Sequence, residues 1–211
     1  MKPFRLTIQH LTKAYGSVPV WNDVSLELSS GQSYCLMGPS GCGKTTFLRI
    51  LLGLEQADSG SILVTYPGQS ASITLAASPL CGAMSAVFQE DRLCEEFSPL
   101  HNVMLTADRH LNRRQIYGEL CRLLPEESVL RPVSTLSGGM KRRVAILRAM
   151  LAPSSAILMD EPFTGLDEET KDRVIAYIKE KAAGRLLLVS THQEEDISSL
   201  NASLLRLIQG A

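Results

Sequence analysis

A glycine-rich stretch between two apolar runs carries residue types that bind phosphate. Gly38, Gly43, Lys44 and Thr45 occupy the pattern G-x-x-x-x-G-K-[ST]. Glycines let backbone N–H groups approach an anion, and the start of a following helix adds partial positive charge. The lysine would reach the β- and γ-phosphates, and the threonine hydroxyl would hold Mg²⁺. A plain glycine-rich turn is the alternative, but an apolar run on either side favours a nucleoside triphosphate site. The candidate residues are Gly38, Pro39, Ser40, Gly41, Cys42, Gly43, Lys44, Thr45 and Thr46.

Two adjacent carboxylates follow an apolar run at residues 156–159. In an open α/β sheet, ligands bind beyond the carboxyl ends of the strands, so Asp160 and Glu161 would lie at the same edge as the phosphate loop. Asp160 fits a Mg²⁺ partner, and Glu161 could polarise a water for attack on the γ-phosphate. Taken alone, a strand ending in acidic surface residues would be the simpler interpretation.

A second anion site is indicated further along the chain. Ser137 can cap a helix with apolar residues at 144, 147 and 151, and Gly138 and Gly139 leave backbone N–H groups uncovered. By itself this sequence is more often a plain helix cap. Together with the phosphate loop, this segment gives one chain two potential phosphate-binding sites.

The elements that would position these residues follow an α/β pattern with an antiparallel layer. Alternation predicts strands at residues 4–8 and 24–28 with a turn region at 16–22, and from residue 34 buried strands alternate with helices. Strands are expected at 34–37, 62–64, 83–88, 155–160, 185–190 and 203–208, and helices at 44–52, 100–107, 113–124 and 168–183. Because residues 91–136 lack strand signals, we expect an inserted helical lobe within a single domain of residues 1–211.

Composition narrows the possible partners. The net charge of -1 argues against strong binding to nucleic acid, and 45% hydrophobic residues suffice for a substantial core. Five cysteines without C-x-x-C spacing suit a reducing cytosol. No segment approaches the run of about 18 apolar residues that spans a bilayer. We therefore expect any role at a membrane to depend on a partner protein.

Three motifs, in their order and spacing, resemble the ATP-binding cassette (ABC) ATPases: residues 38–45, 136–140 and 156–161. The resemblance covers nearly the whole chain. It implies an α/β P-loop NTPase core of ABC-ATPase type, with an antiparallel β layer and a helical subdomain at about residues 91–150. In that family two cassettes meet head to tail, and each ATP lies between the phosphate loop of one and the signature motif of the other.

Further positions gain roles only through this resemblance. Tyr15 resembles the aromatic residue that stacks on adenine, and Gln89 the glutamine that senses Mg²⁺ and contacts the transport partner. Asp167 resembles the polar member of the loop that communicates across the dimer, and His192 the histidine that contacts the γ-phosphate. Each would be unremarkable alone. The resemblance thus implies ATP and Mg²⁺ as cofactors, with Thr45, Gln89 and Asp160 at the metal.

The function implied is ATP hydrolysis, with Glu161 and His192 as catalytic residues, that drives a transporter through dimer closure. Expected partners are a second cassette, with a homodimer favoured, membrane permease subunits and a substrate-binding protein. The chain is expected at the cytoplasmic face of the membrane, without nucleic acid as a partner. Import is favoured, and Met140 and residues 87–93 resemble nitrate, sulfonate and taurine type importers. A soluble ABC-type ATPase is the alternative; a small-molecule P-loop kinase leaves residues 136–140 and His192 without a purpose.

Overall fold

The computed structural model describes residues 2–71 and 84–207. The chain forms two compact units. The first unit comprises residues 1–84, 154–160 and 184–211, and the second comprises residues 85–153 and 161–183. Each unit is built from segments that are distant in the sequence. The phosphate loop, residues 38–45, belongs to the first unit, and residues 136–140, the candidate signature motif, belong to the second.

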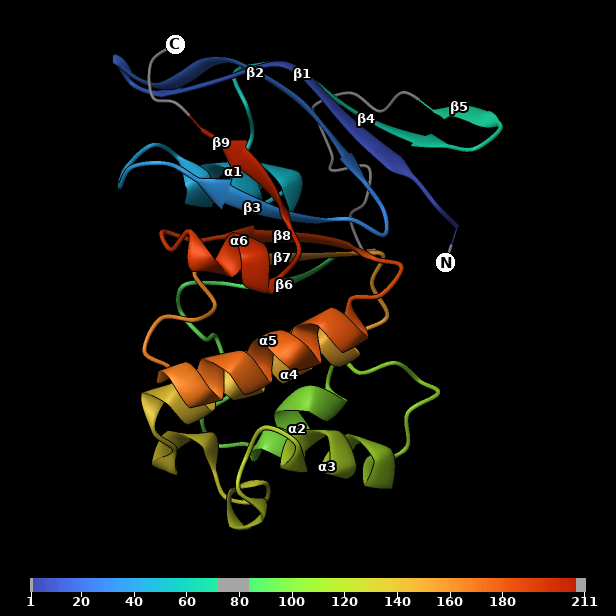
Figure 1. The fold of residues 1–211 in the computed structure, drawn as a ribbon, viewed down its shortest axis with the longest axis vertical. Coiled ribbons are helices and arrows are strands. Elements are labelled where there is room, and N and C mark those ends of the chain that lie inside the picture. Colours follow the sequence, from blue (N-terminus) through green and yellow to red (C-terminus); the bar gives the residue numbers. More distant parts are fainter. Residues whose placement is uncertain (1, 72–83, 208–211) are drawn as a thin grey trace. The chain divides into compact units, whose positions relative to one another are not determined.

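The first unit contains an antiparallel sheet in the order β2-β1-β4-β5, at the top of Figure 1. Its strands are β1 (Arg5–Tyr15), β2 (Val18–Ser29), β4 (Ser59–Tyr66) and β5 (Gln69–Ala71). β1 and β2 run well beyond the predicted strands, because register shifts after Ile8 and Leu11 interrupt the alternation without ending the pairing. The turn between them is reduced to Gly16 and Ser17, with Gly16 at a φ of 59°.

Parallel strands of the same unit end at the phosphate loop and at the carboxylates. They are β3 (Ser33–Met37), β7 (Ala156–Asp160), β8 (Leu186–Ser190) and β9 (Ser203–Arg206), and they lie in the order β7-β8-β3-β9. Every residue of β7 and β8 is buried, as expected for parallel strands covered on both faces. β9 falls within the predicted tail strand, and residue 208 lies outside the described residues.

Helix α1 (Lys44–Leu51) lies between the two sheets of the first unit (Figure 1). One hydrophobic core joins all three elements, with Leu6 from β1, Phe47 from α1 and Leu188 from β8 among its fully buried members. A short helix, α6 (Glu195–Ser199), which the sequence did not predict, follows β8. The core therefore fixes the start of α1 between the sheets, where the phosphate loop enters it.

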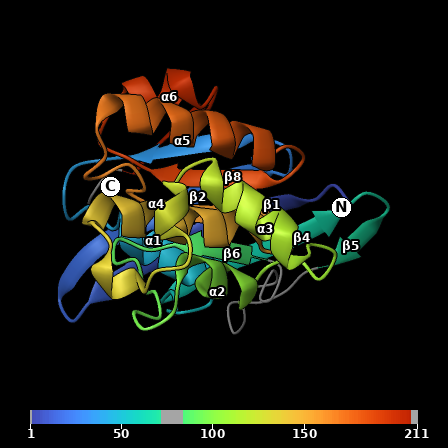
Figure 2. The same ribbon diagram turned by 90° about the horizontal axis from the view of Figure 1, so that it is seen from below.

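The second unit is mostly helical. Strand β6 (Met84–Val87) leads into it, and its other elements are α2 (Pro99–Met104), α3 (Arg113–Cys121), η1 (Glu126–Ser128), η2 (Val133–Thr135), α4 (Gly138–Leu151) and α5 (Glu168–Lys181). Helix α4 packs against α2, α3 and α5 (Figure 2). The predicted helices are present, with earlier ends for α2, α3 and α5. Among the described residues, no helix combines the length and apolar character needed to cross a bilayer.

Candidate functional site

In the loop that joins β3 to α1, a side chain at either of two glycines would clash with neighbouring atoms. Gly43 has a φ of 92°, and a Cβ there would lie 2.3 Å from Val20 Cγ1 and 2.4 Å from Trp21 Nε1. At Gly38, a Cβ would lie 2.5 Å from Cys42 Sγ and 2.6 Å from the carbonyl oxygen of Leu207. The loop is therefore packed tightly from behind, and α1 follows it directly with its uncapped N–H groups.

Lys44 lies buried across this loop. Its Nζ donates hydrogen bonds to the carbonyl oxygens of Gly38 at 2.9 Å and Pro39 at 3.3 Å. The ammonium group is thereby held beside the loop backbone, where a phosphate group would enter. This geometry agrees with a lysine that exchanges carbonyl partners for phosphate oxygens.

The end of β7 faces the start of α1 through a short chain of hydroxyl and carboxylate groups. Thr45 Oγ1 donates to Asp160 Oδ2 at 2.7 Å, and Ser190 Oγ, at the end of β8, donates to Asp160 Oδ1. Asp160 is 5% exposed. Parallel strands bring these groups to one sheet edge, as the sequence predicted for Asp160.

These oxygens fit a magnesium ion. Mg²⁺ prefers hard oxygen ligands and usually binds proteins through one or two side chains, with waters and substrate phosphates completing its octahedron. Thr45 and Asp160 supply a hydroxyl and a carboxylate in mutual contact. Within residues 2–71 and 84–207, no group of three or more histidine, cysteine or acidic side chains could hold a metal by itself. The donor set thus suits an ion that needs a phosphate ligand.

Tyr15 ends β1 with its ring half exposed. Its hydroxyl donates to Glu55 and lies 3.3 Å from Thr46 Oγ1, while Lys13 Nζ lies 5.0 Å from the ring centroid. The hydrogen bonds anchor the tip of the ring and leave its body at the surface. An aromatic ring fixed at one end and exposed along its body is suited to stacking on a base.

His192, two residues beyond β8, shares a hollow with the phosphate loop. This hollow of about 520 Å³ is lined by Met37, Gly38, Pro39, His192, Glu194, Arg206 and Leu207. The His192 side chain is exposed. The first unit therefore places five predicted site residues in or next to the phosphate loop and the start of α1. They are Lys44, Thr45, Asp160, Tyr15 and His192.

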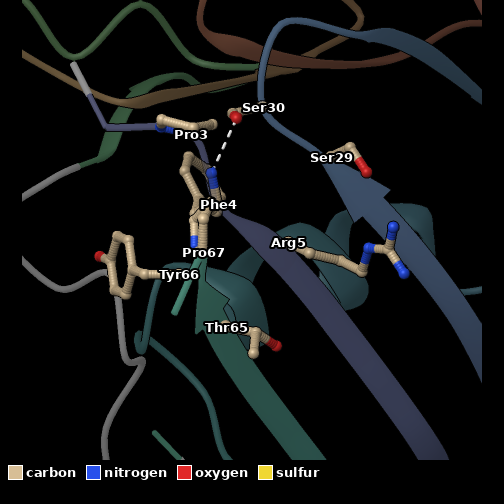
Figure 3. Close-up of a pocket in the computed structure, with 8 residues that line it drawn as sticks. All are labelled: Pro3, Phe4, Arg5, Ser29, Ser30, Thr65, Tyr66 and Pro67. Atoms are coloured by element: carbon tan, nitrogen blue, oxygen red, sulfur yellow. Dashed lines mark hydrogen bonds between the residues drawn. The ribbon is translucent and has the colours of Figure 1, made fainter. Parts of the chain in front are cut away.

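A second hollow, of about 410 Å³, lies at the ends of β1, β2 and β4 (Figure 3). The rings of Phe4 and Tyr66 border it, with centroids 6.4 Å apart, and Phe4 N donates to Ser30 Oγ at 2.9 Å. None of the residues predicted from the sequence to form a site lines it. This hollow is therefore separate from the candidate site.

The signature residues lie at the start of α4 in the second unit. Ser137 caps the helix, since its Oγ accepts a hydrogen bond from Met140 N at 3.3 Å. A Cβ on Gly139 would meet the carbonyl oxygen of Gly165 at 3.4 Å, so this motif packs against the loop that precedes α5. Gly138 has no atom within 4 Å of an added Cβ. Its backbone is therefore open to a ligand.

Asp167 caps α5. Its two carboxylate oxygens accept hydrogen bonds from Thr170 N at 2.9 Å and Thr170 Oγ1 at 2.8 Å. The backbone hydrogen bond from Thr170, its side-chain hydrogen bond and the positive charge of Arg143 lower the pKa of Asp167. The carboxylate is thus held ionised at the helix N-terminus.

The backbone at Gln89 is held by an arginine that the sequence analysis did not single out. Buried Arg142 of α4 donates to the carbonyl oxygens of Phe88, at 2.6 Å, and Gln89, and pairs with Asp91 at 3.2 Å. Burial raises the pKa of Asp91, although the charge of Arg142 opposes this. Gln89 itself is exposed. Only the fold reveals this tether, because the two segments are far apart in the sequence.

Glu161 has an unusual backbone conformation. It follows β7 directly and has a φ of 48°, in the left-handed region that residues other than glycine rarely adopt. Such strained positions cluster at functional sites.

Comparisons with known proteins agree with these motifs. Residues 21–164 match the family model described as ABC transporter. The spermidine/putrescine import ATP-binding protein PotA of Legionella pneumophila is 32% identical over 204 residues, which cover 93% of this chain and 54% of that protein. The Nod factor export ATP-binding protein I of Ralstonia nicotianae is 31% identical over 207 residues, covering 92% of this chain and 61% of that protein. The chain spans about half the length of the first of these relatives.

Among solved structures, one described as the dimeric structure of a bacterial ABC transporter cassette superposes with a TM-score of 0.79. It is 25% identical, and the match covers 96% of this chain and 94% of that one. The match confirms the predicted fold class, an α/β cassette with an antiparallel and a parallel sheet.

Proposed function

The chain belongs to the ABC transporter family, and from that membership we propose that it is the ATP-hydrolysing, nucleotide-binding subunit of a transporter. The observation that carries the proposal is the contact of Thr45 with Asp160 beside a glycine-dependent loop and a buried lysine. These groups have the chemistry needed to hold the phosphates of ATP.

In the proposed site, the loop N–H groups and Lys44 bind the β- and γ-phosphates, and Tyr15 stacks on adenine. Thr45 and Asp160 hold Mg²⁺, with Gln89 as a further partner. When bound, the ion offsets negative charge on the phosphates. Each residue thus acts mainly by positioning and by charge, as phosphoryl transfer requires.

Hydrolysis proceeds by in-line attack of water on the γ-phosphorus. The water oxygen forms a bond to phosphorus while the bond to the oxygen bridging the β- and γ-phosphates breaks. Glu161 accepts the proton from the water, and His192 stabilises the γ-phosphate. ADP and inorganic phosphate are the products. Glu161 acts as general base, and its strained backbone supports a positioned role.

We propose that the working form is a pair of cassettes. Each ATP contacts the phosphate loop of one copy and Ser137, Gly138 and Gly139 of the other, and Asp167 communicates between the copies. ATP then favours the closed pair, and loss of the γ-phosphate releases it. The helical subdomain at about residues 91–150, with Gln89 at its border, receives the membrane subunits.

The proposed direction is import, at the cytoplasmic face of the membrane, with a permease and a substrate-binding protein as partners. Relatives named for import and for export both match the chain. The proposed direction therefore rests on short motifs that resemble those of importers. The likeness to nitrate, sulfonate and taurine importers rests on Met140 and residues 87–93. Relatives named for spermidine/putrescine and for Nod factor do not single out that branch.

The test of the reaction is Glu161→Gln, which keeps the shape of the side chain and removes the base. We expect ATP binding to persist, phosphate release to stop and a dimer to accumulate with ATP. Light scattering after gel filtration and a phosphate-release assay measure both. Lys44→Ala is the control, because it should abolish binding and hence the dimer. Normal turnover by Glu161→Gln would exclude the assigned base.

The test of the transport role is a pull-down of tagged Glu161→Gln protein with ATP from detergent-solubilised membranes of its source. Recovery of a multi-span membrane protein would support a transporter, and a co-purified binding protein would support import. Recovery of soluble partners alone, such as ribosomal or DNA-repair proteins, would favour a soluble ABC-type ATPase and leave the ATPase site intact.

A further inference from the structure

Ser190 makes a close contact with the carboxylate that would face magnesium. Its Oγ donates to Asp160 Oδ1 at 2.5 Å, while Thr45 donates to Asp160 Oδ2 at 2.7 Å. We propose that Ser190 is a positioning residue for Mg²⁺–ATP, because it fixes the rotation of the Asp160 carboxylate. This inference rests on the proposed ATPase function and deepens it.

The strand register places Ser190 for this purpose. Residues of β7 and β8 pair in parallel, with Asp160 directly opposite Ser190 as the last pair of the ladder. Ser190 is 0% exposed and Asp160 is 5% exposed. Backbone pairing thus holds both the donor and the acceptor of this hydrogen bond. Because both residues are buried, the hydrogen bond to the charged group is stronger than it would be in water.

The remaining residues of β8 show why the serine is notable. Leu186, Leu187, Leu188 and Val189 are all buried and apolar, so the strand belongs to the core up to its last residue. An apolar residue at position 190 would continue that pattern. The Ser190 hydroxyl instead donates a hydrogen bond to Asp160 Oδ1. With an apolar residue at position 190, this buried oxygen would lose that donor.

The physical consequence concerns one torsion. A carboxylate that accepts one hydrogen bond on each oxygen, from groups on different elements, has its plane fixed. Thr45 alone fixes one oxygen and leaves the other free to swing. A carboxylate whose plane is already fixed loses less conformational entropy when it binds an ion. Asp160 should therefore bind Mg²⁺ more tightly. Ser190 therefore acts through Asp160 and need not touch the ion or the nucleotide.

The test compares Ser190→Ala with Ser190→Thr. A fluorescent ATP analogue is titrated into each protein in EDTA, and then Mg²⁺ is titrated into the protein–analogue mixture. We expect Ser190→Ala to raise the Mg²⁺ concentration at the titration midpoint about tenfold or more. This is the effect expected from losing one hydrogen bond to a charged group. Metal-free binding should change by less than about twofold, since the phosphate loop is untouched. Ser190→Thr keeps the hydroxyl and should restore the midpoint.

Ser154→Ala is the matched control, because Ser154 is another buried serine of the first unit, whose hydroxyl accepts from Arg185 Nη1 at 3.3 Å. We expect it to lower stability without moving the Mg²⁺ midpoint. If Ser190→Ala does not fold, Ser190→Cys keeps nearly the same volume with a weaker donor and is measured in its place.

The outcomes separate the two proposals. A wild-type Mg²⁺ midpoint in folded Ser190→Ala would overturn the role of Ser190 and leave the ATPase proposal standing. An equal loss of metal-free binding would also overturn it, because the defect would then be a general one of folding. Failure of the wild-type protein to bind the analogue would instead overturn the proposed function.

Discussion

Gly43 and Trp21 meet behind the phosphate loop, the smallest residue against the largest. Trp21, the single tryptophan of the chain, is 1% exposed and packs edge-on against Phe47, with ring centroids 6.2 Å apart. Its Nε1 would lie 2.4 Å from a Cβ on Gly43. The loop is thus shaped by the core beneath it as well as by its own glycines.

This contact predicts that Gly43→Ala is more destabilising than Gly41→Ala. Both glycines have a positive φ, of 92° and 81°, but a Cβ on Gly41 would have no atom within 4 Å. Gly41→Ala should cost about 1–2 kcal/mol from the left-handed backbone alone. Gly43→Ala adds a clash in the core and should cost at least about 1 kcal/mol more. Urea unfolding followed by Trp21 fluorescence measures both, and equal losses would contradict the packing argument.

Cysteine reactivity should follow burial. Burial, with a smaller effect of Asp196, raises the pKa of the Cys35 thiol to about 12, so its reactive thiolate is scarce at neutral pH. Cys94 is exposed. We expect iodoacetamide to alkylate Cys94 in the native protein and Cys35 only after unfolding, as mass spectrometry of tryptic peptides would show. Modification of Cys35 at the rate of Cys94 in native protein would contradict the described packing.

At the scale of elements, helix α4 links two segments through its first turns. It begins at the signature glycines, and Arg142 on its second turn binds the carbonyl oxygens of Phe88 and Gln89. Arg148, further along, donates to the carbonyl oxygens of Asp91 and Arg92. One helix therefore fixes the backbone of residues 88–92 within the second unit.

We predict that Arg142→Lys loosens this segment. A lysine ammonium is a point charge and cannot reproduce the fork that reaches both carbonyl oxygens. Losing one such charged hydrogen bond should cost about 1.5–3 kcal/mol. Hydrogen exchange by mass spectrometry should show faster exchange at residues 88–91, with Arg113→Lys on the exposed start of α3 as the control. Unchanged protection at those residues would exclude the tether.

The ion pair between α3 and α5 gives the second unit a pH dependence. Arg122, the residue that caps α3, donates to both carboxylate oxygens of Glu180, at 2.9 and 2.6 Å. These hydrogen bonds lower the pKa of Glu180 to about 2 from an ordinary value of 4.5. The stabilisation is therefore complete above the ordinary value and is lost as the pH falls toward the lowered one.

Glu180→Gln should accordingly lower the unfolding midpoint slightly at neutral pH, because exposed ion pairs contribute little. The difference from wild type should close as the pH falls from about 4.5 to about 2. Thermal melts across that range measure it. High salt should shrink the difference at neutral pH, and a difference that grows in acid would contradict the assigned pair.

At the scale of the whole molecule, the proposed function assigns one chain two phosphate-binding segments, the loop before α1 and the start of α4. In the proposed pair, each ATP contacts one segment from each copy. Lys44→Ala removes the loop lysine, and Ser137→Arg places a bulky side chain at the second segment. Each variant alone should lack both shared sites and hydrolyse no ATP. A mixture should regain turnover, because a mixed pair keeps one intact site.

Phosphate release across mixing ratios measures this recovery, with a maximum expected at equal amounts. The control is a mixture of Lys44→Ala with Lys44→Met, which offers no intact loop at any ratio. Activity of Ser137→Arg alone, or no recovery on mixing, would contradict a site shared between copies.

The sequence by itself determined the fold class and the identity of the candidate residues. Phosphate loops, caps and strand-end carboxylates are local patterns, since each needs only residue types at fixed spacing. The G-x-x-x-x-G-K-[ST] pattern therefore located the loop before α1, and the apolar run of β7 located Asp160. Ser137 was found in the same way, as the cap of α4, whereas Asp167, which caps α5, was singled out only through the family resemblance.

Only the tertiary structure decided which distant groups meet. Ser190 lies opposite Asp160 because β7 and β8 pair in one register, and no spacing in the sequence encodes that register. The length of β1 escaped prediction because its irregular register hides the alternation. Likewise Trp21 reads as one more apolar residue until the core places it against Gly43. Local patterns fix what a residue can do, whereas long-range packing decides which residue supports it.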